Sequence, residues 1–426
     1  MFKFIHAADI HLDSPPRGLM QSAGAAGEGL RDVTRRALEN LVSLAITERV
    51  AFVVISGDLY DGDWKDFNTG LFLARCLGRL REAGIRAYIV YGNHDAQSNM
   101  TKTLRWPEGV HVFPTTGGAR FIDEQSGAAL HGRSFLDRGT DENLVPSYGP
   151  PVAGAFNIGV LHTALEGNTM HATYAPTSVE ELKNKGYDYW ALGHVHARAV
   201  LCADPWIVFS GNLQGRHIRE EGPKGATLVT VDEGRVVACE HVPLDVLRWR
   251  HLVVDAEGAA SRSVVEDRVR EAMVRAVADE AGGRTLAMRV TVRGSGRAHG
   301  ELVTHAEAFT AELRAMALGL GGDVALVEKV RVEMTAARAA AGAAGGAGLV
   351  EETADELRRM FGDAPTDAEL LALVKGDLDA LRGKLPAEAI ADLDPGPLDS
   401  LLKGRLDELV RDAAPLLLAR LAGGEG

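Results

Sequence analysis

Short runs of apolar residues alternate with stretches of helical periodicity along the first 240 residues of the chain. Most of these runs are continuously apolar, which is typical of strands that are covered on both faces. They predict strands over residues 2–8, 51–56, 86–91, 156–162, 187–192, 206–210 and 227–231. Between them, residues 30–50 and 71–83 carry apolar side chains at helical spacing. This alternation predicts an α/β layered fold for residues 1–240.

A smaller module, residues 241–336, repeats the alternation. Strands are predicted over residues 250–254, 285–293 and 325–334, and helices over residues 263–281 and 302–318. The order predicts a compact βαβαβ domain. In its first helix, an apolar stripe that includes Val265, Val269 and Met273 is expected to pack into the core.

The end of the chain differs in composition from both modules. Residues 337–348 contain almost only alanine and glycine, so we interpret them as a linker. Residues 349–426 show leucines at helical spacing, with Gly and Pro between the helical stretches. Small amphipathic helices cannot bury their apolar faces alone. They either dock on the rest of the chain or present a groove to a partner.

The composition indicates a soluble globular protein, with 46% hydrophobic and 25% charged residues in 426. No apolar stretch approaches the roughly 20 residues that a membrane span needs, and the first residues lead into a strand pattern rather than a signal peptide. Three widely spaced cysteines, Cys76, Cys202 and Cys239, fit a reducing compartment. We therefore expect a cytoplasmic protein with no membrane partner.

The net charge of -13 at first disfavours nucleic acid as a partner, because nonspecific binding to phosphates depends on Lys and Arg. The acidic excess is concentrated near the end of the chain: residues 346–426 contain 17 acidic and 9 basic residues. Several of the other acids are candidate metal ligands, and bound cations would offset their charge. Composition therefore neither supports nor excludes DNA.

Five short polar blocks follow apolar runs, and together they carry the chemistry of the chain. Asp9 and His11 are two residues apart at the end of the first predicted strand, where strand periodicity would send both side chains to one face. Gly57-Asp58 follows the second strand. A carboxylate such as Asp58 can bridge two ions with its two oxygens.

The remaining blocks offer amide and imidazole groups. Asn93, in Gly92-Asn93-His94-Asp95, can offer a carbonyl oxygen to a metal, and His94 follows where a proton donor could face a substrate. His162 ends one apolar run, and His194 and His196 follow another. All five blocks are predicted at the carboxyl ends of strands, where α/β sheets bind ligands. Mixed imidazole, carboxylate and amide ligation suits manganese, iron or zinc better than magnesium, and we favour manganese.

In this order the blocks D-x-H, G-D, G-N-H-D, H and G-H-x-H resemble the calcineurin-type metallophosphoesterase superfamily. The resemblance covers residues 1 to about 240. Three segments are more similar to the DNA repair exonuclease branch, which includes the nuclease subunit of the bacterial SbcCD complex; they are residues 9–15, 57–62 and 205–217.

The resemblance implies a two-sheet sandwich flanked by helices, with two divalent metal ions. Carried across position by position, Asp9, His11, Asp58 and His196 would hold one ion, and Asp58, Asn93, His162 and His194 would hold the other. Ions roughly 4 Å apart activate a water for in-line attack on a phosphodiester. His94, which is not a ligand in this family, would protonate or stabilise the leaving oxygen.

One position departs from the pattern, because some relatives carry a second active-site histidine three residues after the bridging aspartate. Here that position is Asp61, which we include as a catalytic candidate. Asp61 either orients His94 or binds water, or it caps the following turn.

Candidate substrate contacts lie outside the five blocks. Arg216, His217, Arg219 and Lys224 could contact phosphates of DNA, but with Glu220 and Glu221 between them a solvated loop is the alternative. His171 either lines the cleft or anchors its own loop.

The leading hypothesis is a metal-dependent DNA phosphodiesterase of DNA repair, an exonuclease with or without endonuclease activity. The resemblance implies that residues 241–336 cap the active site and guide DNA, and that the helices of residues 349–426 bind an SMC-like coiled-coil ATPase. We also consider a homodimer. One alternative is a phosphoesterase for a small nucleotide or a phosphoprotein, since the superfamily shares these ligands. The other is a non-catalytic scaffold with a structural metal centre, which the presence of His94 disfavours.

Overall fold

The computed structural model describes most of the chain up to residue 337 and isolated positions beyond it. The described residues are 1–19, 29–61, 67–97, 106–137, 140–165, 174–321, 324–337, 356, 359, 364–367, 369, 371–372, 375 and 405–406. The predicted linker and most of the helices expected in residues 349–426 therefore lie outside the described residues. The chain divides into two compact units, of which one contains residues 1–252, 273–289 and 314–329, and the other contains residues 253–272, 290–313 and 330–426.

Two six-stranded mixed sheets form the first 243 residues. The first sheet has the order β12-β11-β1-β2-β3-β4, from Arg235–Pro243, Gly225–Asp232, Phe2–Ala7, Phe52–Ser56, Arg86–Val90 and Val110–Val112. The second has the order β5-β6-β7-β8-β10-β9, from Ala119–Ile122, Ala129–Gly132, Asn157–His162, Tyr189–Gly193, Trp206–Phe209 and Ala199–Ala203. Strands β1, β2 and β3 are parallel to one another, and so are β6, β7, β8 and β10.

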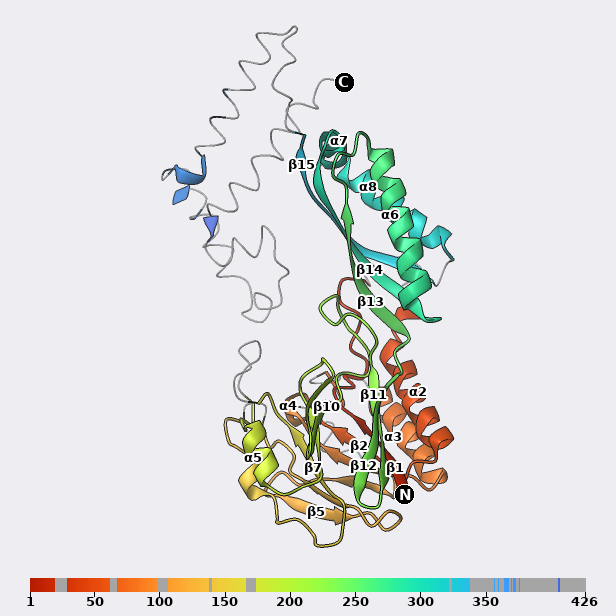
Figure 1. The fold of residues 1–426 in the computed structure, drawn as a ribbon, viewed down its shortest axis with the longest axis vertical. Helices are drawn as coiled ribbons and strands as arrows, with labels where there is room; N and C mark the ends of the chain where they lie inside the picture. Colours follow the sequence, from red (N-terminus) through yellow and green to blue (C-terminus); the bar gives the residue numbers. More distant parts are fainter. Residues whose placement is uncertain are drawn as a thin grey trace. The chain divides into compact units, whose positions relative to one another are not determined.

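Four layers result, because both faces of each sheet are covered. The facing sides of the two sheets share one apolar core, with Phe4, Phe52 and Tyr88 from the first sheet and Ile158 and Tyr189 from the second. Helices α2 (Val33–Glu48) and α3 (Phe67–Glu82) lie side by side against the outer face of the first sheet (Figure 1). Helix α5 (Val179–Asn184) contributes to the core on the outer face of the second sheet.

The α/β prediction is confirmed: two mixed sheets are flanked by helices. All seven strands predicted in residues 1–240 are present, with ends shifted by at most two residues. The pattern missed β4, β5, β6, β9 and β12. These strands are short or lie at sheet edges, and three of them, β5, β9 and β12, mix half-buried and exposed positions.

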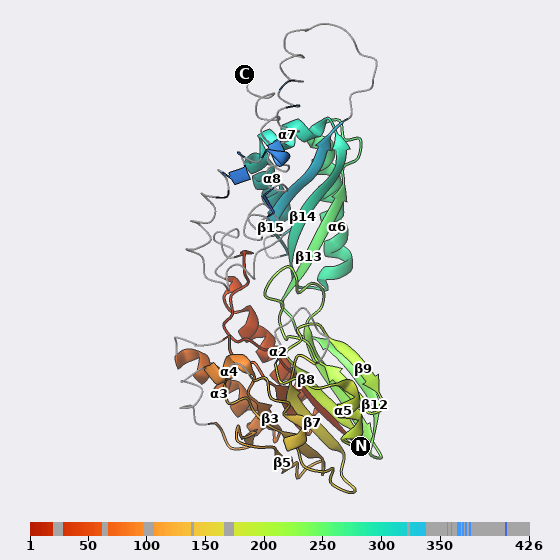
Figure 2. The ribbon, with the colours of Figure 1, turned by 90° about the vertical axis from the view of Figure 1, so that its left-hand side faces the viewer.

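A third sheet has the order β13-β14-β15, from Leu247–Asp255, Thr285–Gly296 and Ala325–Ala336, and its long strands run side by side (Figure 2). Helix α6 (Arg262–Ala276) lies between β13 and β14 in sequence, and it continues into a π-helical turn (Val277–Ala281). Its predicted stripe is buried at Val265, Val269 and Met273. The second predicted helix is instead two helices, α7 (Ala298–Thr304) and α8 (Ala306–Gly319), because the backbone leaves the helical conformation at His305. No helix in the described part of the chain is long and apolar enough to cross a membrane.

Candidate metal centre

The five polar blocks meet where the carboxyl ends of the two sheets face one another. Strands β1, β2 and β3 lead into Asp9, Asp58 and Asn93, while β7 ends on His162 and β8 leads into His194. Backbone hydrogen bonds hold neighbouring loops together: Asp9 N donates to Gly57 O at 3.0 Å, and His11 N donates to Asp58 O at 3.0 Å. The prediction that all five blocks lie at strand ends is confirmed.

The reason predicted for the convergence of Asp9 and His11 is wrong. Strand β1 ends at Ala7, and both residues have positive φ values, +50° and +44°. Asp58 and His194 also have positive φ, +53° and +97°. Left-handed turns after the strands therefore direct these side chains inward, and the two-residue period of a strand does not apply to them.

Two glycines are required for the close packing of this centre. Gly57 has φ +92°, and a side chain there would collide with the His162 ring. A side chain at Gly92 would collide with the Asp58 carboxylate. The small residues in the motifs therefore let the ligand-bearing loops approach one another.

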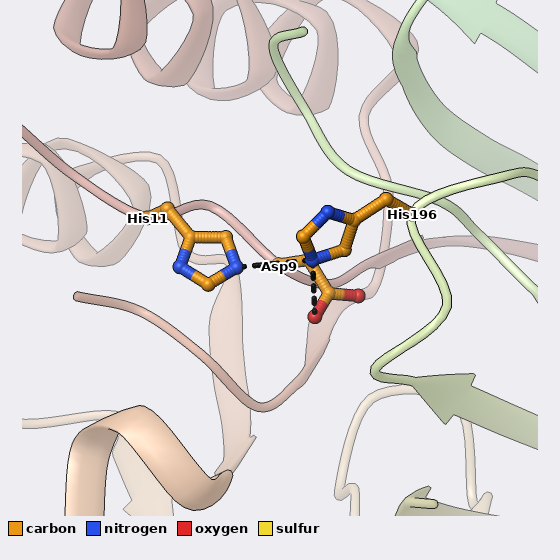
Figure 3. A group of neighbouring side chains, drawn as sticks. All are labelled: Asp9, His11 and His196. Atoms are coloured by element: carbon orange, nitrogen blue, oxygen red, sulfur yellow. Dashed lines mark hydrogen bonds and ion pairs between the residues drawn. The ribbon is translucent and has the colours of Figure 1, made fainter. Parts of the chain in front are cut away.

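Asp9, His11 and His196 form one group of converging ligand atoms (Figure 3). The two Nε2 atoms of His11 and His196 lie 3.2 Å apart, and His196 Nε2 lies 3.7 Å from Asp9 Oδ1. All three side chains point toward one locus from two separate loops. This group matches three of the four residues predicted for one ion.

Asp58 is shared by the two other groups, Asp9-Asp58-His162 and His11-Asp58-His94. Its Oδ2 lies 3.8 Å from His11 Nε2 and 3.5 Å from His162 Nε2, between imidazoles that come from different sheets. Asp58 therefore occupies the position of a bridge between two cation sites.

His162 presents a lone pair to the second locus. Its Nδ1 donates to the Ser56 carbonyl oxygen at 2.9 Å, so the other ring nitrogen, Nε2, carries no proton in the neutral ring. Nε2 faces Asn93 Oδ1 at 2.9 Å. Two acceptor atoms at this distance are suited to a cation between them. His194 lies beside this locus, with its ring centroid 5.2 Å from that of His162, although it is outside the three groups found in the described chain.

Burial of these ionisable side chains destabilises the fold when no cation is bound. Asp9, His11, Asp58 and His162 are at most 2% exposed. Burial, together with the charge of Asp58, raises the pKa of Asp9 well above its usual range, and burial also raises the pKa of Asp58. Burial lowers the pKa of His162 to about 4 and that of His11 well below its usual value. Neutral imidazoles beside buried carboxylates are the donors that a divalent transition metal takes, so the residues fit the predicted metals.

His94 is more accessible than His11 or His162, with 30% of its side chain exposed. Its backbone N–H donates to Asp58 Oδ1 at 3.0 Å, which fixes the loop, and its Nδ1 lies 3.7 Å from Asp61 Oδ1. Asp61 also accepts a hydrogen bond from Ser14 Oγ at 2.9 Å and pairs with Arg216 Nη1 at 3.1 Å. Asp61 thus faces the centre, between His94 and a buried arginine.

The loop that carries the predicted substrate contacts is partly buried. Arg216 and Lys224 are 7% and 8% exposed, His217 is half-buried, and Arg219 is exposed. Lys224 Nζ donates to the His196 carbonyl oxygen at 3.0 Å. A fully solvated loop is therefore not what the structure contains. The remaining candidate, His171, lies outside the described residues.

Sequence reasoning missed two acidic residues of the centre. Glu220 is 5% exposed, and its Oε1 lies 2.7 Å from His196 Nδ1. Asp95 is 2% exposed and accepts hydrogen bonds from Tyr60 N at 3.1 Å and Gly92 N at 3.0 Å, so it joins the loops after β2 and β3. The position of Asp95 inside the third block was a usable signal. Glu220 lies in a segment of charged residues, and no sequence signal distinguished it from its neighbours.

Comparisons with known proteins agree with this geometry. Residues 2–198 match the family model of the calcineurin-like phosphoesterases, and residues 249–335 match that of the metallophosphoesterase YhaO middle domain. An uncharacterized metallophosphoesterase, YhaO, from Bacillus subtilis (strain 168) is 35% identical over 272 residues, which are 63% of this chain and 66% of that protein. The matched part is thus just under two thirds of the relative's length.

Two solved structures show weaker similarity. The protein TT1561 of Thermus thermophilus has a TM-score of 0.33 at 14% identity, covering 57% of this chain and 99% of the other. A dimetal phosphatase from Danio rerio has a TM-score of 0.35 at 14% identity, covering 55% and 93%. The matched family models and the converging Asp and His ligands lead to one assignment. Through the domain that contains residues 2–198, the chain belongs to the calcineurin-like metallophosphoesterase superfamily.

Proposed function

We propose that this protein is a phosphodiesterase that depends on two divalent metal ions and hydrolyses DNA. The observation that carries the proposal is the position of Asp58, whose carboxylate is shared by two groups of converging ligands. A carboxylate between two loci, each completed by imidazoles, is the arrangement of a two-metal hydrolytic site.

In this proposal Asp9, His11, Asp58 and His196 hold one ion, and Asp58, Asn93, His162 and His194 hold the other. Manganese is the proposed metal, because the donors mix nitrogen and oxygen. When bound, the two ions supply a nucleophilic water and neutralise charge on the phosphoryl group.

We assign the transfer of a proton to the leaving oxygen to His94. It stands beside Asp58 and is more exposed than the proposed imidazole ligands His11 and His162, so a substrate can reach its ring. Its backbone hydrogen bond to Asp58 keeps it at a fixed place relative to the ligands. Burial lowers the pKa of His94, while the nearby carboxylates of Asp58 and Asp61 act in the opposite direction. In its protonated form the imidazole can donate a proton to a leaving oxygen.

DNA is proposed as the substrate on two grounds. The segments of residues 9–15, 57–62 and 205–217 resemble the DNA repair exonucleases. Exposed arginines just beyond two of these segments lie near each other: Arg17 N donates to Arg216 O at 2.7 Å, and the exposed side chains of Arg17 and Arg219 both act electrostatically on His217. A basic rim of this kind suits a polyanion more than a small diester.

The test compares three substrates: linear duplex DNA, single-stranded DNA and bis-para-nitrophenyl phosphate. Each is incubated with the full-length chain and Mn²⁺, and again with a chelator. Cleavage of DNA that requires Mn²⁺ is expected. Turnover of the small diester without any DNA cleavage, even with an ATPase partner added, overturns the DNA assignment, and turnover of none of the three overturns the phosphodiesterase proposal. Binding of a coiled-coil ATPase by residues 349–426 stays a prediction.

A further inference from the structure

His11 and His196, which form one group with Asp9, each have a carboxylate near their outer nitrogen. His196 Nδ1 lies 2.7 Å from Glu220 Oε1, while its Nε2 points the opposite way, toward His11 and Asp9. The carboxylate accepts from Nδ1–H, so the proton is held on the outer nitrogen. The lone pair of Nε2 is thereby directed into the centre.

Glu220 is itself fixed by further contacts. Its Oε2 accepts hydrogen bonds from Asn212 Nδ2 at 2.8 Å and from the Arg216 backbone N–H at 2.6 Å. Its side chain is only 5% exposed. The carboxylate therefore has one orientation. Its other oxygen, Oε1, faces His196 and also lies 3.3 Å from His217 Nε2.

His11 has a looser counterpart in Asp61. Asp61 Oδ1 lies 3.4 Å from His11 Nδ1, too far for a well-formed hydrogen bond, and among the described residues this nitrogen has no closer acceptor. Ser14 Oγ holds the other oxygen of Asp61 at 2.9 Å. Asp61 therefore faces the outer nitrogen of His11 as Glu220 faces that of His196, but at a longer distance.

Arg216 connects the two carboxylates. Its Nη1 lies 3.1 Å from Asp61 Oδ1, its Nη2 lies 3.6 Å from Glu220 Oε1, and its side chain is 8% exposed. Both contacts are on the outer side of the imidazoles, away from the locus that they share with Asp9. This guanidinium is therefore placed to support the ligands.

We propose that Glu220 and Asp61 are positioning residues that orient His196 and His11 toward one metal ion, and that Arg216 joins them into one rigid support. The proposal rests on the two-metal site of the proposed function. Carboxylates that bind the second nitrogen of a ligand histidine fix its tautomer and raise its basicity, and losing one typically weakens metal affinity by about 10–100-fold. The effect should fall on the ion held by Asp9, His11 and His196, and spare the ion beside His162.

The test is a titration of the metal-free full-length chain with Mn²⁺, followed by bound-metal analysis and by electron paramagnetic resonance. The wild-type chain should bind two ions and give the signal of a coupled pair. Glu220→Gln keeps the size and the hydrogen-bonding oxygen of the side chain but removes its charge. It should weaken one of the two sites by about 10–100-fold, leave the other unchanged, and give the signal of an isolated ion at one equivalent. Asp61→Asn should weaken the same site less, because its contact with the imidazole is longer.

Glu181→Gln is the matched control. Glu181 accepts hydrogen bonds from Asn143 at 2.7 Å and Thr177 at 2.8 Å, but faces no proposed ligand, so both sites should keep their affinities. Thermal melting of each metal-free variant separates a folding defect from a ligand effect.

The outcomes distinguish this inference from the proposed function. Wild-type affinity at both sites in Glu220→Gln overturns the inference, as does an equal loss at both sites. A wild-type chain that binds fewer than two ions overturns the two-metal proposal. If it binds one ion, weaker binding of that ion in Glu220→Gln supports the role of Glu220, and unchanged binding overturns it.

Discussion

Asp58→Asn should have opposite effects on stability with and without metal. In the metal-free protein the Asp58 carboxylate is 2% exposed and close to the Asp9 carboxylate, and burial raises its pKa above the value of an unfolded chain. A carboxyl group with a raised folded-state pKa destabilises the fold at every pH above its unfolded-state pKa, which is 3.8 for Asp58, so the destabilisation is present at pH 7. The amide of asparagine removes that charge and can still accept the hydrogen bond from His94 N.

The magnitudes follow from linkage. Because burial raises the pKa of Asp58 in the folded chain, removing its charge should make the metal-free variant more stable than the wild type, with a higher melting temperature. With Mn²⁺ at about 100 times the dissociation constant, each occupied site adds about 2.7 kcal/mol, so two sites should raise the wild-type melting temperature by roughly 10–20 °C. The variant lacks the shared ligand and should gain only a few degrees.

Differential scanning fluorimetry at pH 7, with chelator and across a Mn²⁺ titration, measures both effects. Asp245→Asn is the control, since Asp245 is also buried but is paired with Arg248 at 3.0 Å and Arg284 at 2.8 Å. That variant should melt at a lower temperature without metal and keep the full metal response. The reasoning is refuted if Asp58→Asn still gains the wild-type increment, or if its metal-free form melts below the wild type.

Three further predictions concern catalysis, local packing and pH. His94→Ala should still bind two ions but turn over bis-para-nitrophenyl phosphate more slowly by on the order of 100-fold or more; full activity would remove His94 from the reaction. Gly57→Ala should lose metal binding, measured by titration with Mn²⁺, because its side chain collides with His162 at a φ of +92°, and normal binding would contradict this. His6 is fully buried, and burial lowers its pKa to about 3 against 6.5 in an unfolded chain, so it should cost about 2 kcal/mol of stability as the pH falls from 7 to 5. Denaturation of His6→Gln at both pH values should show that loss removed; an unchanged pH dependence would refute it.

The strands that carry the centre could be predicted from the sequence because most of their positions are buried. Strand β2 (Phe52–Ser56) and strand β7 (Asn157–His162) are buried at every position, so their apolar runs are continuous and easily detected. Strand β5 (Ala119–Ile122) alternates between half-buried and exposed positions over four residues. A pattern this short is set by pairing with a neighbour, which local sequence does not reveal.

The predicted ligands could also be recognised from local sequence, whereas the residues that support them could not. Asp58, Asn93 and His162 stand in short motifs with a glycine or an apolar run beside them. Glu220 is 24 residues away from His196 in sequence and among other charged side chains, and only the tertiary fold brings its carboxylate to the imidazole. Partners joined by such long-range contacts need the structure before they can be identified.

The backbone of the ligand loops bears on how the centre is formed. Asp9, His11 and Asp58 all have positive φ values, and each residue of this kind costs on the order of 1–3 kcal/mol. The hydrogen bonds from Asp9 N to Gly57 O and from His11 N to Asp58 O, both 3.0 Å, hold these turns against the neighbouring strand end. Because these bonds involve only backbone atoms, the turns do not depend on a bound ion or on the Asp58 side chain. Replacing that carboxylate should therefore remove the shared ligand and leave the turns in place, and this is why the metal response and the fold are expected to separate in Asp58→Asn.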